Sequence, residues 1–138
     1  MIHILVSVFC YDVWFYLSHL LLHTRRLWPI HREHHTKVEP EWQDTYVGHW
    51  SESVLQGLGM LVPMGFWSFT WTDIGIVLLF LNVRGMMRHD GRCNWLIGNH
   101  HLLHHKDPRF NYGEYWLDRL GGTLYPKREE ADAGWIYI

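Results

Sequence analysis

The chain has 138 residues, of which 48 % are hydrophobic, 16 % aromatic and 19 % charged, and this composition excludes an intrinsically disordered segment. The formal net charge of −2 leaves no positive excess for a nucleic-acid partner, and two cysteines, Cys10 and Cys93, are too few for a disulfide scaffold. Histidine is the unusual component, with 12 residues, and the spacing of these residues is the main clue to function.

The first predicted element is an apolar helix over residues 1–22, interrupted by His3, Asp12 and His19. Its length is close to the roughly 20 residues that cross a bilayer. It lacks the basic start of a secretory signal peptide, and its internal Asp and His also argue against a cleaved signal. The alternative is a buried core helix of a soluble domain. We predict a helix embedded in a membrane.

Two histidine clusters come next. His19 and His23 are four residues apart, and residues 31–35 read His-Arg-Glu-His-His. Residues three and four apart share one face of a helix, so each cluster is expected to present two or three imidazoles in one direction. The basic residues near these clusters are Arg25, Arg26, Arg32 and Lys37. Basic residues beside a membrane-spanning segment indicate its cytosolic side.

Residues 45–87 form the longest apolar stretch, and Asp73 is the one charged residue between Ser53 and Val83. The stretch divides near residues 63–65 into halves that are each about long enough to cross a bilayer. Its end and the residues after it are again basic, with Arg84 inside the stretch and Arg88 and Arg92 after it. Because both flanks are basic, we predict a membrane hairpin that returns the chain to the cytosolic side.

The HxxHH spacing recurs at residues 101–105, directly after His100. Packing does not explain this, because a buried imidazole without a partner is costly, whereas a metal ion uses the lone pair of the ring nitrogen. A lone histidine such as His3 is interpreted as an ordinary surface or core residue. Eight or nine clustered imidazoles exceed the needs of one tetrahedral zinc and suit two metal ions; iron, zinc and copper remain open. The HExxH motif of zinc peptidases is absent from the sequence.

HxxxH, HxxHH, an apolar hairpin and a second HxxHH together resemble the fatty acid hydroxylase/sterol desaturase superfamily. Residues 12–19 are similar to the helix that leads into the family's first histidine box, and residues 27–31 to the lead into the second. Residues 111–113 and 116–123 resemble the closing signature NYG…WDRxxGT. The resemblance covers most of the chain, from about Asp12 to Tyr125.

This resemblance implies an all-α fold, an integral membrane helical bundle with a cytosolic histidine-rich cap, formed by residues 1–138 as one domain. It implies an enzyme of the endoplasmic reticulum or the bacterial inner membrane that uses two non-haem iron ions and dioxygen to hydroxylate or desaturate a lipid. Sterol, fatty acyl, sphingoid and carotenoid substrates stay open, and zinc is a substitute for iron. Electrons would come from a b-type cytochrome or from a ferredoxin with its reductase.

The family's boxes match eight histidines, and His89 resembles a histidine that some members carry after the hairpin. The metal ligands implied are His19, His23, His31, His34, His35, His89, His101, His104 and His105. His49 is either a further ligand or a supporting residue, and His100 a supporting one. Relatives often have another histidine near His89, so a water held by Asn82 or Asn99 is expected to complete one iron.

A metal-bound imidazole ties its other N–H to a carboxylate or carbonyl group. The carboxylates considered for this role are Asp12, Glu33, Asp90 and Asp118.

Two other protein classes remain. One is a histidine-rich membrane protein that holds zinc for hydrolysis or structure, and the other is a catalytically inactive, lipid-binding relative. Met1 lies 18 residues before His19, whereas family members commonly have further membrane helices there. We therefore expect a minimal form, an internal start or an N-terminally truncated chain.

Overall fold

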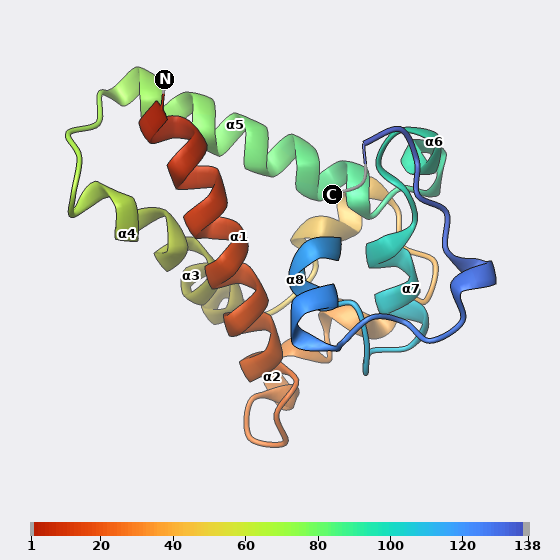
Figure 1. Ribbon diagram of the computed structural model, residues 1–138. Coiled ribbons are helices and arrows are strands. Elements are labelled where there is room, and N and C mark those ends of the chain that lie inside the picture. The colour runs from red at the N-terminus through yellow and green to blue at the C-terminus, as the bar shows by residue number, and fades with distance from the viewer. Residues whose placement is uncertain (1, 137–138) are drawn as a thin grey trace.

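The computed structural model describes residues 2–136, and within that range every regular element is a helix (Figure 1). The α-helices are α1 (Ile2–Leu22), α2 (Trp28–His31), α3 (Trp50–Gly57), α4 (Leu61–Met64), α5 (Trp71–Arg88), α6 (Asn94–Ile97), α7 (His100–Lys106) and α8 (Tyr115–Gly121). The 3-10 turns are η1 (His34–Thr36), η2 (Trp42–Tyr46), η3 (Leu58–Met60), η4 (Gly91–Cys93) and η5 (Arg128–Glu130). The predicted all-α fold is confirmed.

Helices α1, α3 and α4 lie in one half of the molecule and α6, α7 and α8 in the other, and α5 runs from the first half toward the second (Figure 1). Helix α1 packs against α3, η3, α4 and α5. The approach of η3 is close enough to require glycine, because a Cβ atom on Gly59 would lie 2.7 Å from Cδ1 of Trp14. The indole of Trp14 also donates to the carbonyl of Leu55 (2.8 Å). These contacts bring α3 beside the last turns of α1, where the first histidines lie.

The apolar stretch of residues 45–87 differs from the expected pair of uninterrupted halves. Its first half is broken after η2 and continues through α3, η3 and α4, whereas its second half is the single helix α5. Helix α5 begins with a capping box, in which Thr70 and Asp73 satisfy each other's backbone N–H groups, and it ends at Arg88, just before His89. In the described residues, α1 is the one helix long and apolar enough to cross a bilayer by itself. The membrane hairpin stays a prediction.

The distribution of polar residues in α1 is the reverse of that in a soluble protein. Ser7, Asp12 and His19 are buried, whereas Leu5 and Phe9 are 68 % and 56 % exposed. Across residues 2–136, buried polar and charged side chains outnumber buried apolar ones. A soluble domain buries its apolar side chains instead. An exposed apolar face around a polar interior is the arrangement expected of helices surrounded by lipid.

Candidate metal centre

The nine predicted ligands lie together in two groups, within which one ring nitrogen of each residue is within 4.8 Å of the others. The five-histidine group consists of His19, His23, His31, His35 and His104, and the four-histidine group of His34, His89, His101 and His105. Most of these side chains are buried. Within residues 2–136, the structure thus brings together all nine histidines and adds no further one to either group.

The two HxxHH boxes are each divided between the groups. In the second box of the chain, His31 and His35 face the five-histidine group, but His34 faces the other group. In the third, His104 faces the five-histidine group and His101 and His105 the four-histidine group. Two histidines of each box therefore share a group, as the helical spacing predicts, and the third faces the other group. Neighbouring positions in a helix point about 100° apart, so one box can serve two sites.

Backbone carbonyl groups fix the orientation of several rings. In the four-histidine group, Nδ1 of His34 donates to Val47 O (2.9 Å), Nδ1 of His89 to Gly85 O (2.8 Å) and Nδ1 of His105 to Lys37 O (3.1 Å). A carbonyl oxygen only accepts, so Nδ1 carries the proton and Nε2 keeps a lone pair. All three rings therefore present an unprotonated nitrogen to the group.

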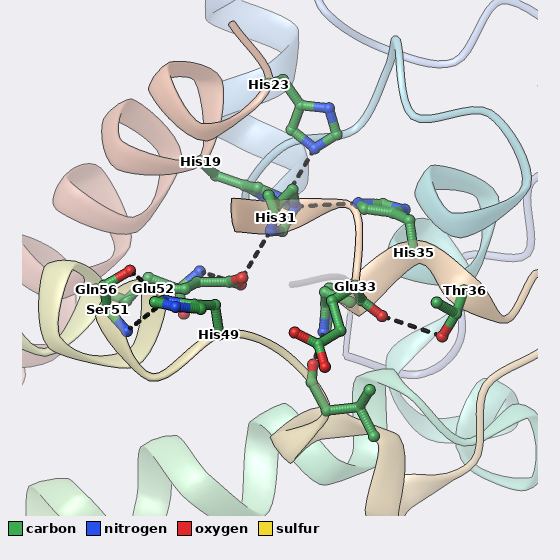
Figure 2. Close-up of polar contacts among 12 residues, drawn as sticks. His19, His23, His31, Glu33, His35, Thr36, His49, Ser51, Glu52 and Gln56 are labelled. Atoms are coloured by element: carbon green, nitrogen blue, oxygen red, sulfur yellow. Dashed lines mark hydrogen bonds and ion pairs between the residues drawn. The ribbon is translucent and has the colours of Figure 1, made fainter. Parts of the chain in front are cut away.

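The same arrangement recurs in the five-histidine group. Nδ1 of His19 donates to Tyr112 O (2.5 Å) and Nδ1 of His104 to Phe110 O (2.6 Å). Figure 2 shows the rings of His19, His23, His31 and His35 turned toward one another. Here too the carbonyl groups leave Nε2 as the inward-facing atom. A hydrogen bond from the other ring nitrogen to a carbonyl oxygen is the outer contact that metal-bound histidines usually make.

The inward nitrogen atoms repel each other unless a cation lies between them. Nε2 of His34 is 3.1 Å from Nε2 of His89, although both carry lone pairs, and Nε2 of His105 is buried with no hydrogen-bond partner. Metal binding satisfies all three atoms at once, whereas an empty polar interior would cost free energy. The residues present therefore fit a metal ion in this group.

The spacing of the nitrogen atoms also bears on the number of ligands. Adjacent Nε2 atoms are 2.9–3.3 Å apart in the five-histidine group and 3.1 Å apart in the other. For metal–nitrogen bonds of about 2.1 Å, ligands lie about 3.0 Å apart at a right angle and about 3.4 Å apart at the tetrahedral angle. The spacings are close to these values, so the five nitrogen atoms of one group and the four of the other are near enough to be ligands of one ion each.

The closing NYG…WLDRLGGT segment supports the carbonyl groups that orient His19 and His104. Asp118 is fully buried and accepts hydrogen bonds from Tyr112 N, Gly113 N (both 2.8 Å) and Thr123 Oγ1 (2.6 Å). It also contacts Nε2 of His100 at 3.0 Å. One carboxylate thus holds the loop from which Tyr112 O projects toward the five-histidine group.

The supporting residues predicted from the sequence differ in their distance from the histidine groups and in what they bind. His100 is held by Asp118 and lies outside both groups, as expected of a supporting residue. His49 is exposed and caps α3, where Nδ1 accepts from Ser51 N, so the ligand alternative for it is not supported. Asn99 binds the backbone of Glu130 and Asp132. Asn82 accepts from the Tyr46 hydroxyl at the edge of the cavity described below.

The carboxylates considered as partners of metal-bound imidazoles mostly bind other groups. Asp12 pairs with Arg84, Asp90 pairs with Arg92, and Glu33 is exposed. Sequence reasoning missed Glu52, which contacts Nδ1 of His31 at 3.0 Å. No motif indicated this residue, because it lies on α3, in a stretch interpreted only as apolar.

A partly open cavity of about 290 Å³ reaches both histidine groups. Its lining on one side includes His19, His31, His34, His89 and His101. The lining also includes the apolar side chains of Phe15, Met60, Leu78 and Leu81, together with the charged side chains of Arg84 and Arg88. The cavity therefore gives a partly apolar molecule access to both histidine groups.

Acid is expected to destabilise the metal-free protein. Burial lowers the pKa of His31 to about 4, whereas an unfolded histidine titrates near 6.5. Between these values the unfolded chain takes up a proton that the folded chain does not, so the free energy of unfolding falls as the pH decreases from about 6.5 toward 4. Thermal unfolding of the metal-free protein in detergent should have a lower midpoint at pH 5 than at pH 7.5. Equal midpoints would contradict neutral buried imidazoles.

Two adjoining histidine groups, in a helical fold with exposed apolar side chains, define the class of membrane-type metalloproteins. Comparison with known proteins identifies the family. The chain belongs to the fatty acid hydroxylase family, whose model matches residues 4–123. The predicted family is thereby confirmed.

Two curated relatives are named lathosterol oxidase. The mouse (Mus musculus) protein is 30 % identical over 154 aligned residues, which cover 99 % of this chain and 51 % of the relative. The rat (Rattus norvegicus) protein is 29 % identical with the same coverage. The chain therefore spans about half the length of the curated relatives it matches. The comparison with solved structures finds no match.

Proposed function

We propose that the chain forms the metal-binding core of a membrane enzyme that uses dioxygen to hydroxylate or desaturate a lipid. The observation that carries this proposal is the convergence of nine imidazoles in two adjoining groups, next to a cavity with apolar walls. Family membership supports a lipid-oxidising activity in the broad sense. Dioxygen and the exact reaction are the parts added here.

Iron is the proposed metal in both groups. Imidazole ligands accept iron, zinc or copper, so the ligand type does not decide between them. In one group, five converging nitrogens exceed the four ligands of structural zinc. When bound, two iron ions would supply the oxidising power to break an unactivated C–H bond, for which side chains alone are insufficient.

The side chains around the ions would then orient the lipid and exclude water. Phe15, Leu78 and Leu81 offer an apolar wall for a hydrocarbon segment, next to His19 and His89. Since the relatives are named for a sterol, a sterol is the first substrate to test. The proposed electron donor is a separate b-type cytochrome or a ferredoxin with its reductase.

The proposed location is a membrane, with the histidine groups at its cytosolic face. Helix α1 has 21 residues, about 31 Å in length, which matches the thickness of a bilayer core. Its exposed apolar face includes Leu5, Phe9, Leu17 and Leu21. Arg25 and Arg26 follow α1 directly and are exposed, which favours a cytosolic position for the histidine end.

The test is a comparison of lipids from cells that express the protein with those that do not. We expect a new hydroxylated or desaturated lipid that requires oxygen and iron, and that incorporates label from ¹⁸O₂ if the product is an alcohol. Purified protein that contains zinc in place of iron, and cells with unchanged lipids, would instead favour the zinc-binding or the inactive, lipid-binding alternative.

A further inference from the structure

Glu52 is a buried carboxylate whose place in the metal centre is unassigned. It lies on α3 and is 7 % exposed, and its Oε2 atom is 3.0 Å from Nδ1 of His31 (Figure 2). Its Oε1 atom accepts from the side chain of Gln56 at 3.3 Å. Oε2 of Glu52 and Nδ1 of His31 are both buried, and neither atom has another hydrogen-bond partner.

This contact distinguishes His31 from the other oriented histidines. His19, His34, His89, His104 and His105 each place Nδ1 against a neutral backbone carbonyl. Within residues 2–136, Glu52 is the only carboxylate found in contact with one of the nine histidines. Its direct contact is therefore with the five-histidine group, and its charge also acts, without contact, on His34 of the four-histidine group.

The surrounding backbone leaves room for this carboxylate. Gly48 has a φ of 153°, and a Cβ atom there would lie 3.3 Å from Oε2 of Glu52. A side chain at this position would therefore press on the carboxylate as well as strain the backbone. Gln56, one helical turn away, holds the other oxygen atom without adding charge.

His31 is well placed to transmit the influence of Glu52. Its Nε2 atom is 2.9 Å from Nε2 of His19 and 3.0 Å from Nε2 of His35. A carboxylate at Nδ1 selects the tautomer in which the Nε2 lone pair faces the place where these three nitrogen atoms meet. It also makes the imidazole a stronger electron-pair donor to a metal ion. In turn, a cation at this point offsets the cost of burying an ionised carboxylate.

We propose that Glu52 is a positioning residue for the metal ion of the five-histidine group, through its contact with His31. This inference rests on the proposed metal centre. The two groups then differ in their outer contacts: one orients its ligands with carbonyl groups, and the other has in addition a carboxylate in contact with a central ligand.

The test measures how many metal ions each variant retains in the presence of increasing chelator. Glu52→Leu removes the acceptor and the charge, and we expect about 10–100-fold weaker retention of one of two ions, as for other outer contacts of metal ligands. Glu52→Gln keeps an acceptor without charge and should retain both ions but lose one at a lower chelator concentration than the wild type. The matched control is Glu33→Gln, which changes an exposed carboxylate in the same histidine segment and should behave as the wild type.

Double variants show which group is affected. His101→Ala should leave an ion in the five-histidine group, and adding Glu52→Leu should remove it. His104→Ala should leave an ion in the four-histidine group, and adding Glu52→Leu should weaken its retention much less than it weakens that of the five-histidine group. Circular dichroism of each variant checks the fold, and if Glu52→Leu does not fold, Glu52→Gln is used in the same pairs.

Two results separate the failure of this inference from that of the proposed function. A wild-type chain that binds fewer than two ions refutes the metal centre, whatever Glu52 does. Two ions in the wild type with unchanged retention in both Glu52 variants, or equal loss from both groups, overturn the assignment of Glu52 and leave the centre intact.

Discussion

Replacing His104 with alanine is expected to reduce lipid oxidation more than about 100-fold, because loss of even an outer contact of a metal ligand costs about 10–100-fold. His104 is fully buried, and its Nε2 atom is 3.1 Å from Nε2 of His35, so the replacement removes one of the five converging nitrogen atoms. The measurement is the rate of product formation in membranes with equal amounts of wild-type and variant protein. The same loss is expected for alanine at His31, His34 or His105.

His3→Ala is the matched control for this prediction. His3 contacts Asp73 at the far end of α1 and belongs to neither histidine group. Its replacement should leave the rate close to that of the wild type. Oxidation at the wild-type rate by the His104 variant would refute its assignment as a ligand.

Replacing Asp118 with alanine is expected to lower the free energy of unfolding by about 3–5 kcal/mol, the usual cost of removing one partner from a buried charged network. The carboxylate accepts from two backbone N–H groups and a hydroxyl, and it contacts His100. The N–H groups of Tyr112 and Gly113 and the hydroxyl of Thr123 would each lose this acceptor. The loop that carries Tyr112 O would also lose its support.

Chemical unfolding in mild detergent measures this difference. The control is Asp107→Ala, which removes a surface pair with Arg109 and should change stability little. Asp118→Ala with the stability of the wild type would show that the closing segment does not depend on this carboxylate.

Much of the metal centre could be predicted from the sequence, because its residues occur at helical spacings. The pairs His19/His23, His31/His35 and His101/His105 each have four-residue spacing, and each pair lies in one group. The division of a box between groups could not be predicted in the same way. Which group His34 or His104 faces depends on how η1 and α7 are rotated against each other, and this is a property of tertiary packing.

The fold shows the same division between local and tertiary information. Residues 1–22 were expected to form a helix, and α1 spans Ile2–Leu22, because a long apolar run has few alternatives. The break in the first half of the apolar stretch was not foreseen. There, residues 47–49 interrupt the helix and place Val47 O against His34. Helix α3 begins after them, and in this position Glu52 contacts His31.

Anomalous X-ray scattering at the iron absorption edge, from crystals of the iron-loaded protein, tests the metal centre most directly. The account predicts two peaks, one among the nitrogen atoms of the five-histidine group and one among those of the four-histidine group. A single peak, or peaks away from these nine side chains, would contradict it.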